Sequence, residues 1–210
     1  MEAGPAVDHR ERILQVARAH FFRLGFARFT MSDLARELGM SKKTVYQHFR
    51  SKEEIIDGLI SAKAAEIAAG FDELLAIPDL SFADRAGRLL RHGRSRMGEM
   101  SLGFLHDLQR FAPASYARLE EFRGRIAPRM WEQLLREGIR TGAVRADVDP
   151  KATANLILVV MHSLLHPDNL DRLQLEPAQV MSGFFRLIFV GILTDAGRLD
   201  HESTPNILTP

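Results

Sequence analysis

The chain has 210 residues, of which 46% are hydrophobic and 26% are charged, a balance that is ordinary for a folded soluble protein. Its formal net charge is only +1, so the overall charge does not indicate a nucleic-acid partner, and the lack of cysteine excludes disulfides, thiolate metal sites and cysteine nucleophiles. The most apolar runs, 156–165 and 184–193, each cover about ten residues, fewer than the roughly 18 that cross a bilayer. Because the first residues are polar and unlike a secretory signal, we expect a cytoplasmic protein with no membrane partner.

The N-terminal region is predicted to begin with a flexible arm over residues 1–8, which contains Gly4 and Pro5. A first helix is expected to start after Asp8, whose carboxylate can cap it, and to end at Gly25. Apolar residues recur along this segment mostly at spacings of three and four, which indicates one buried helical face. They are Ile13, Val16, Ala17, Ala19, Phe21 and Leu24.

Two shorter helices are predicted next, separated by a break. Thr30 is the expected N-cap of the second helix, and Gly39 is expected to end it. Ser41 then caps a third helix, in which Val45 and Phe49 stand four residues apart and share an inward face. A turn of about three residues joins the two helices, and this is the spacing of a helix-turn-helix.

A fourth helix is predicted to begin at Ser51, with Glu54 closing a capping box, and to extend to about Phe71. The rest of the chain shows helical spacing and no alternating pattern typical of a β-strand, so the expected fold class is all-α. The further helices are expected over residues 82–100, 101–111, 115–140, 150–166 and 177–195, followed by a polar, flexible tail.

Five short motifs stand at consistent spacing in the first part of the chain: Gly25-Phe26, Thr30-Met31-Ser32-Asp33-Leu34-Ala35, Leu38-Gly39-Met40-Ser41, Thr44-Val45-Tyr46-Gln47-His48-Phe49 and Ser51-Lys52-Glu53-Glu54. Together they resemble the N-terminal DNA-binding domain of TetR/AcrR-type transcriptional regulators. Two residues depart from that pattern, because many members carry glycine at the position of Lys43 and a small polar residue at that of Phe29. Neither departure disturbs the inward helical face.

The resemblance implies an all-α fold in which a three-helix helix-turn-helix domain precedes a helical domain that binds a small effector and dimerises through its last two long helices. The implied boundaries are an arm over 1–8, a DNA-binding domain over 9–55, an effector-binding and dimerisation domain over 56–200, and a tail over 201–210. The implied partners are a pseudo-palindromic operator in double-stranded DNA, a second copy of the chain and a small molecule of unknown identity. We expect neither catalysis nor a cofactor, because no spacing of Ser and His forms a recognisable catalytic site.

Residues 41–52 carry four cationic side chains and no carboxylate, which suits a polyanion better than a small substrate. Lysine can donate to guanine and glutamine can pair with adenine, so Lys42, Lys43 and Gln47 are the candidate base readers at the start of the recognition helix. Hydroxyl and cationic groups nearby are expected to contact the DNA backbone, and for Tyr46 and His48 the resemblance implies this role. These backbone candidates are Thr30, Thr44, Tyr46, His48 and Lys52.

A set of methionine, aromatic and aliphatic residues has two interpretations, because such residues form ordinary cores and also line adaptable apolar pockets. The candidate effector pocket comprises Met97, Met100, Phe104, Leu108, Phe122, Ile126, Met130 and Trp131. A basic run is also open to two interpretations: a solvated face that pairs with acids elsewhere, or a site for an anionic effector or partner. Its members are Arg85, Arg88, Arg91, Arg94 and Arg96.

The last two helices are apolar over more than one stripe, so they must be buried in a core or against a second subunit, and we expect a homodimer. His162 and His166 stand four residues apart, as metal ligands on one helix do, but no third ligand is visible. Capping or interface packing is therefore the preferred interpretation of these histidines, and no metal is expected.

The chain as a whole is best interpreted as a DNA-binding transcriptional repressor that a small molecule releases. The alternative is a helical small-molecule-binding dimer or adaptor without DNA binding. The intact cationic face of residues 41–52 favours the repressor.

Overall fold

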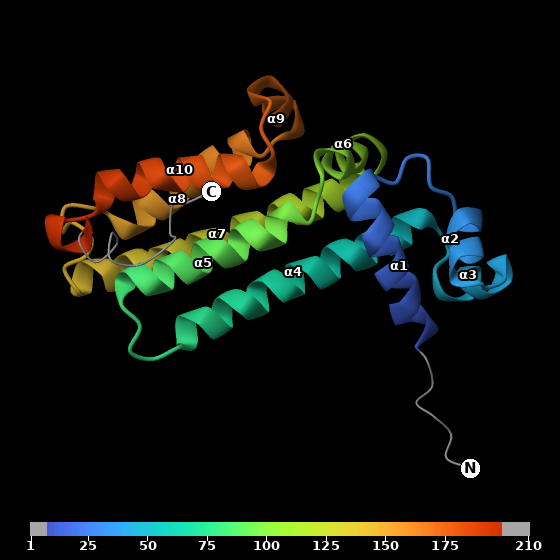
Figure 1. Cartoon of the computed structure of the whole chain (residues 1–210), viewed down its shortest axis with the longest axis horizontal. Coiled ribbons are helices and arrows are strands. Elements are labelled where there is room, and N and C mark those ends of the chain that lie inside the picture. The colour runs from blue at the N-terminus through green and yellow to red at the C-terminus, as the bar shows by residue number, and fades with distance from the viewer. Residues whose placement is uncertain (1–7, 199–210) are drawn as a thin grey trace, which may run out of the picture. The chain divides into compact units, whose positions relative to one another are not determined.

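The structure is a computed structural model that describes residues 8–198, and this range contains ten named α-helices (Figure 1) and a further helical stretch at residues 195–198. An isolated antiparallel bridge joins Val144 to Leu193, and the described range contains no named strand, which confirms the predicted all-α class. Within that range no helix is both long and apolar enough to cross a membrane. The helices are α1 (His9–Leu24), α2 (Met31–Leu38), α3 (Lys42–His48), α4 (Lys52–Ala76), α5 (Phe82–Gly98), α6 (Leu102–Phe111), α7 (Pro113–Arg140), α8 (Pro150–Leu164), α9 (Pro167–Leu173) and α10 (Pro177–Ile192).

The helices belong to two compact units. Unit 1 comprises Met1–Lys63 and Met100–Leu119, and unit 2 comprises Ala64–Glu99 and Glu120–Pro210. Helices α1, α2, α3 and α6 lie in unit 1, whereas α4 and α7 each contribute residues to both units. Because α6 packs in unit 1, each compact unit combines two separate stretches of the chain, whereas each predicted domain is one continuous stretch. The predicted domain boundaries are assigned by function, and they stay a prediction.

The first three helices begin at the N-caps that the sequence predicts. The carboxylate of Asp8 accepts a hydrogen bond from the backbone N–H of Arg10 at 2.9 Å. Thr30 forms a reciprocal capping box at the start of α2. The Ser41 hydroxyl accepts from the backbone N–H of Thr44 at 3.0 Å at the start of α3. Each cap satisfies an N–H group that has no partner inside its own helix.

Helices α1, α2 and α3 are held together by side chains that water scarcely reaches. Ile13 and Ala17 of α1, Leu34 of α2, and Val45 and Phe49 at α3 are all at most 1% exposed. Burying one large aliphatic or aromatic side chain contributes about 1.5–3 kcal/mol. The two inward residues predicted for the third helix therefore fix which side of α3 faces outward.

Helix α6 is attached to α1 by a backbone hydrogen bond and by ring packing. The N–H of Ser101 donates to the carbonyl of Phe22 at 2.7 Å. The ring of Phe104, which is fully buried, lies 4.8 Å from that of Phe22 and 5.8 Å from that of Phe26. Figure 1 shows α6 beside the C-terminal end of α1. The start of α6 is thus an integral part of unit 1.

Unit 2 has its own core, formed by the second half of α4, α5, most of α7, α8 and α10. Helices α5 and α10 pack along each other (Figure 1). The ring of Trp131 on α7 stacks on that of Phe185 on α10, with centroids 4.5 Å apart. Gly138 lets α7 approach its neighbours closely, because a Cβ atom there would lie only 2.5 Å from Val144 and 2.6 Å from Phe82.

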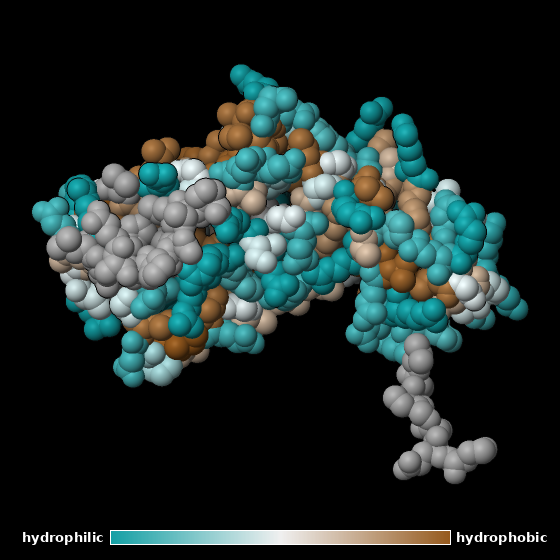
Figure 2. Space-filling view, viewed as in Figure 1, coloured by the Kyte–Doolittle hydropathy of each residue, from teal (hydrophilic) through white to brown (hydrophobic). Residues whose placement is uncertain are grey.

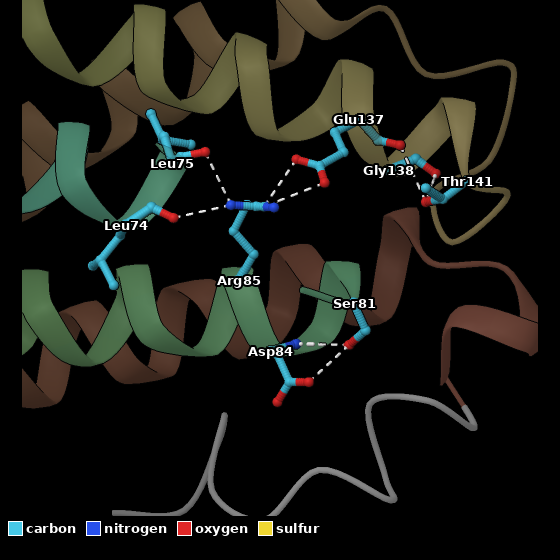
Figure 3. Close-up of polar contacts among 8 residues, drawn as sticks. All are labelled: Leu74, Leu75, Ser81, Asp84, Arg85, Glu137, Gly138 and Thr141. Carbon is cyan, nitrogen blue, oxygen red and sulfur yellow. Dashed lines mark hydrogen bonds and ion pairs between the residues drawn. The ribbon is translucent and has the colours of Figure 1, made fainter. Parts of the chain in front are cut away.

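Arg85 of α5 is buried in unit 2 and closes the C-terminal end of α4 (Figure 3). One of its terminal nitrogens, Nη1, donates to the carbonyls of Leu74 and Leu75 at 2.9 and 3.0 Å, and its Nε lies 3.0 Å from a carboxylate oxygen of Glu137. The last carbonyls of a helix have no partner inside it and carry partial negative charge, so a cation stabilises them. One interpretation of the basic run predicts a solvated face that pairs with acids elsewhere. Arg85 does pair with an acid, but it is buried inside the protein.

Several helices differ from the predicted ones, and three of these differences have a visible cause. Helix α4 continues beyond Phe71 to Ala76, where Arg85 caps it. Helix α9 was not predicted. Pro167 was expected only to end the preceding helix, but proline also fits the first turn of a helix, and here it begins α9. Helix α10 ends early because Leu193 leaves the helix to form the bridge already described.

Candidate nucleic-acid interface

Helices α2 and α3 form the predicted helix-turn-helix. Gly39 ends α2 in the left-handed conformation, with φ of 63°, which glycine adopts without steric cost. Its N–H donates to the carbonyl of Arg36 at 3.2 Å, and the N–H of Met40 donates to that of Ala35 at 2.9 Å. Ser41 then starts α3. Because the turn satisfies these carbonyls of α2, the two helices are joined in a defined geometry.

The outward side of α3 combines positive charge with polar groups that can bind bases or phosphates. Val45 and Phe49 are completely buried, so residues between them must point away from the core. The structure gives neither lysine of this helix an ion-pair partner within the described range. Four of the predicted DNA contacts are exposed on this side: Lys42, Lys43, Tyr46 and Gln47.

The hydroxyls of the two predicted threonine contacts already have partners at the starts of their helices. The Thr44 hydroxyl lies 2.8 Å from that of Ser41. The Thr30 hydroxyl donates to the carboxylate of Asp33 at 2.6 Å, and hydrogen bonds from the Thr30 side chain and backbone, together with the charge of Arg36, lower the pKa of Asp33. A carboxylate beside Thr30 disfavours a phosphate at that hydroxyl. The contacts of both threonines with DNA stay predictions.

The first turn of α1 lies against the C-terminal end of α3. The rings of His9 and His48 meet edge to face, 5.7 Å apart. The guanidinium of Arg10 lies 5.0 Å from the centre of the Phe49 ring. Both α1 residues are exposed and extend the basic surface beyond α3. Sequence reasoning did not select them, because no spacing rule connects the start of the first helix with the end of the third.

The ammonium of Lys52 binds protein backbone. Its Nζ donates to the carbonyls of Phe26 and Phe29 at 2.9 and 3.3 Å and lies 5.6 Å from the centre of the Phe26 ring. The sequence predicts a phosphate anchor here, and a phosphate contact by Lys52 stays a prediction. The structure adds a second role, since this side chain holds the turn between α1 and α2.

The start of α4 has the predicted capping box, except that the Glu54 carboxylate binds the N–H one residue before the expected one. The Ser51 hydroxyl accepts from the N–H of Glu54 at 3.2 Å, as expected. The carboxylate of Glu54, however, accepts from the N–H of Arg50 at 2.6 Å. Hydrogen bonds from its own backbone N–H and from Ser51 lower the pKa of Glu53. The residues that follow α3 are therefore tied to the first turn of α4.

The candidate effector residues are divided between the two units. Those of unit 1 are buried in its core, where Phe104 and Leu108 are completely inaccessible. In unit 2, Ile126 packs partly buried against the core that contains the remaining residues. The side chain of Met97 lies outside the described residues. Unit 1 contains Met100, Phe104 and Leu108, and unit 2 contains Phe122, Ile126, Met130 and Trp131. Their role as a pocket stays a prediction.

A cavity of about 730 Å³ lies within unit 2 between α4 and α5. Arg96, on its edge, forms ion pairs with Glu66 and Glu99. Arg88 and Arg91 are exposed and have no ion-pair partner in the part of the chain that the structure describes. Of the basic run, Arg85 and Arg96 are therefore paired with neighbouring acids, whereas Arg88 and Arg91 present exposed guanidinium groups at this cavity. The cavity is lined by Glu66, Ala69, Gly70, Glu73, Leu74, Asp84, Arg88, Arg91, His92 and Arg96.

Helices α8 and α10 leave large apolar side chains in contact with water. Leu187 of α10 is 76% exposed, and Leu156 and Val159 of α8 are each 64% exposed. Figure 2 shows hydrophobic atoms at the surface over this part of unit 2. Gathered apolar side chains of this kind mark an interaction surface.

His162 of α8 pairs with an acid. Its Nδ1 forms a short contact with the carboxylate of Glu120, which also accepts from Arg123 at 2.5 Å. Within the described range, no three His, Cys, Asp or Glu side chains gather as metal ligands would. His166 is the N-cap residue of α9 but makes no cap hydrogen bond with its side chain. For His162, packing against a neighbouring helix is thus the role that the geometry supports.

Comparison with known proteins finds a family profile that matches the helix-turn-helix and its flanks. Residues 13–59 match the profile described as bacterial regulatory proteins, tetR family. Over 184 residues the chain is 23% identical to the uncharacterized HTH-type transcriptional regulator YvaF of Bacillus subtilis, covering 84% of this chain and 94% of that protein. It is 26% identical over 157 residues to the HTH-type transcriptional repressor KstR2 of Mycobacterium tuberculosis, covering 70% of this chain and 74% of that repressor.

Solved structures show the same fold. The ketosteroid transcriptional regulator KstR2 of Mycobacterium tuberculosis aligns over 92% of this chain and 99% of its own, with 22% identity and a TM-score of 0.58. A TetR-family transcriptional regulator from Marinobacter aquaeolei VT8 aligns over 93% of this chain and 96% of its own, with 19% identity and a TM-score of 0.68. At these identities the likeness establishes the architecture.

Proposed function

We propose that this chain is a TetR-type transcriptional regulator, which represses transcription until a small molecule releases it from its operator. The repressor role is supported by the similarity to the transcriptional repressor KstR2. Within this proposal, residues 9–55 form the DNA-binding domain and residues 56–200 bind the effector and the second subunit in the cytoplasm.

The exposed side of α3 is the observation that carries this function. Lys42, Lys43 and Gln47 extend from a helix whose opposite side is buried, so they can reach base edges in the major groove. Tyr46 and His48 would contact the sugar-phosphate backbone, and Thr30 and Thr44 would do so once their hydroxyls exchange their present partners for DNA. These contacts would fix the register of the helix on the duplex, while the base contacts specify the sequence.

A selection of DNA duplexes from a randomised pool tests the function directly. The protein should enrich pseudo-palindromic sequences whose half-sites lie about one helical turn, or 34 Å, apart or a multiple of it. The affinity for an enriched duplex should fall steeply as salt rises, because phosphate contacts release counterions. Recovery of unenriched pool sequences would instead favour the alternative, a helical small-molecule-binding adaptor without DNA binding.

Dimerisation through α8 and α10 is supported by the apolar side chains that these helices expose. Two copies would bury Leu156, Val159 and Leu187 in a four-helix interface. Leu187→Glu should convert the dimer to monomers, because a buried unpaired carboxylate is strongly unfavourable, and operator affinity should fall with it. Sedimentation velocity measures the change, and Glu121→Ala on the exposed side of α7 is the control. A Leu187→Glu protein that sediments as the parent does would reject this interface.

The effector is proposed to be a small molecule that binds between the helices of the C-terminal domain. The apolar candidates from Met97 to Trp131 suit a largely hydrophobic ligand, whereas Arg88 and Arg91 suit an anionic group. Release requires that the ligand bind the operator-bound and free conformations with different affinity, and α4 would carry the change. A thermal-shift screen, repeated with operator present, identifies such ligands, because an inducer should stabilise the free protein more than the complex. No catalytic role is proposed.

A further inference from the structure

The turn between α1 and α2 immediately precedes the helix-turn-helix and sets where α2 begins. The turn includes Gly25, Phe26, Ala27 and Phe29. Because these residues lie outside both helices, their backbone N–H and C=O groups cannot all be paired by regular helical hydrogen bonds. Buried backbone N–H and C=O groups nearly always have a partner. In this turn two other helices of unit 1 supply partners, one for the N–H groups of Phe26 and Ala27 and one for the C=O groups of Phe26 and Phe29.

Asp107 of α6 binds the N–H groups. Its Oδ2 accepts from the N–H of Phe26 at 2.6 Å and from that of Ala27 at 2.7 Å. Two successive N–H groups aimed at one oxygen form a concave anion site, and hydrogen bonds to a carboxylate are about twice as strong as neutral ones. Gly25 has φ of 80°, and a Cβ atom there would lie 2.5 Å from the same oxygen. Glycine is thus required at this position both for its conformation and for the approach of Asp107.

Lys52, in the first turn of α4, binds the C=O groups of the same turn. Its Nζ donates to the carbonyls of Phe26 and Phe29 and lies over the ring of Phe26. The peptide groups on either side of Phe26 are therefore held from opposite sides, its N–H by an anion and its C=O by a cation. An ammonium engaged in this way has fewer donors for a DNA phosphate, since lysine has only three.

The attachment of α6 places Asp107 within a tightly packed part of unit 1. Phe104, on the preceding turn of α6, is fully buried against the rings of Phe22 and Phe26, and the N–H of Ser101 donates to Phe22. Asp107 follows Phe104 by three residues and so lies on the same side of the helix. Its contacts with the turn therefore belong to a packed junction within unit 1.

We propose that Asp107 and Lys52 are positioning residues for DNA recognition, which hold the α1–α2 turn from opposite sides and so set the orientation of α2 and α3. The inference rests on the proposed DNA-binding function. It makes α6 a second element, in addition to α4, that is bound directly to the turn leading into the DNA-reading helices. It also assigns Lys52 to the protein's own backbone in place of a phosphate.

Asp107→Ala, compared with Glu121→Ala, tests the anionic half of the clamp. Both substitutions remove one negative charge, which by itself strengthens binding to a polyanion. Glu121→Ala should therefore leave the affinity for a selected operator duplex unchanged or slightly higher, whereas Asp107→Ala should lower it about tenfold because two N–H groups lose their acceptor. The slope of log affinity against log salt should stay at the parent value in both variants. Asp107→Asn, which keeps one acceptor oxygen, should bind more tightly than Asp107→Ala.

Amide hydrogen exchange, followed by NMR in the DNA-free protein, separates a local role from general unfolding. In Asp107→Ala the amides of Phe26 and Ala27 should exchange about tenfold faster or more, while those in the centre of α1 should change less. Because this readout needs no DNA, it tests the clamp even if the proposed function fails. If the parent selects no duplex, the DNA-binding function is wrong; if the parent binds and Asp107→Ala binds equally well when folded, the positioning role is wrong.

Lys52→Met tests the cationic half. It should lower operator affinity about tenfold with no change in salt slope, and the loss should not add fully to that of Asp107→Ala, because both act on one turn. A phosphate anchor predicts the opposite pattern: a salt slope smaller by about 0.9 and full additivity. That second pattern would overturn the assignment of Lys52. Should Asp107→Ala not fold, the comparison of Asp107→Asn with the parent, by the same exchange and affinity measurements, decides the anionic half.

Discussion

The two basic runs of this chain, around α3 and along α5, look alike in sequence but differ in what surrounds them. Lys42 and Lys43 of α3 are exposed, and the structure gives them no ion-pair partner within its described range. Arg85 and Arg96 of α5 are both paired with carboxylates, and Arg85 is buried against the end of another helix. Positive charge is therefore left available for binding at Lys42 and Lys43 and is used in packing by Arg85 and Arg96, because among the described residues acids lie near the second pair and not the first.

Arg85→Met should have the largest effect on stability. It breaks a buried ion pair and uncovers two helix-end carbonyls, so we expect a loss of about 3 kcal/mol in the free energy of unfolding. Arg88→Met, on an exposed side of the same helix, should change this free energy by no more than about 0.5 kcal/mol. Urea titration measures both. Equal losses in the two variants would mean that burial does not distinguish the arginines of α5.

Lys43→Ala should reverse this pattern. The free energy of unfolding should change by at most about 0.5 kcal/mol, because the side chain is exposed. Operator affinity should fall about tenfold, the low end of the 1–3 kcal/mol for a base contact. Fluorescence anisotropy with a selected duplex gives the affinity. If Lys43→Ala were destabilised and still bound the operator normally, the charge of Lys43 would serve packing, as that of Arg85 does on α5.

Gln47→Ala should have a narrower effect. If Gln47 reads one base, the preference at a single operator position should relax by about 1 kcal/mol while binding to the other positions is retained. Binding to a set of duplexes that differ base by base measures this preference. An unchanged profile would mean that the exposed side of α3 is not read through this residue.

The pH dependence at Asp33 should be the smallest effect. Hydrogen bonds from Thr30 lower the pKa of Asp33 below its ordinary value of 3.8 in the folded protein. Its contribution to stability is therefore present above that value and is lost as pH falls through the lower, folded-state pKa. Asp33→Asn should remove this part of the acid dependence in unfolding experiments at low pH. A parent and variant with the same dependence would show that the cap of α2 is not sensitive to protonation.

Local signals in the sequence were sufficient for much of unit 1. Asp8, Thr30 and Ser41 cap their helices as predicted, since a cap depends on residues within one turn of it. Val45 and Phe49 are buried as their spacing predicts. Helix α9 was missed because Pro167 is compatible both with ending a helix and with starting one.

Other features depended on contacts between residues far apart in the chain. Asp107 binds Phe26 across 81 positions, and Arg85 meets Glu137 across 52, so no local pattern indicates either pair. The apolar candidates for the effector pocket likewise gave no sign that α6 packs in unit 1 while most of α7 packs in unit 2.

The sequence by itself thus determined the all-α class, the caps, the helix-turn-helix and the exposed side of α3. These follow from hydrogen bonds and side-chain periodicity within a few residues. Only the tertiary structure decided which cations are free to bind DNA and which hold the protein together, because charge and burial depend on the partners that folding brings near. Lys52 shows the difference: its sequence context predicts a phosphate contact, and the fold gives its ammonium the carbonyls of a distant turn.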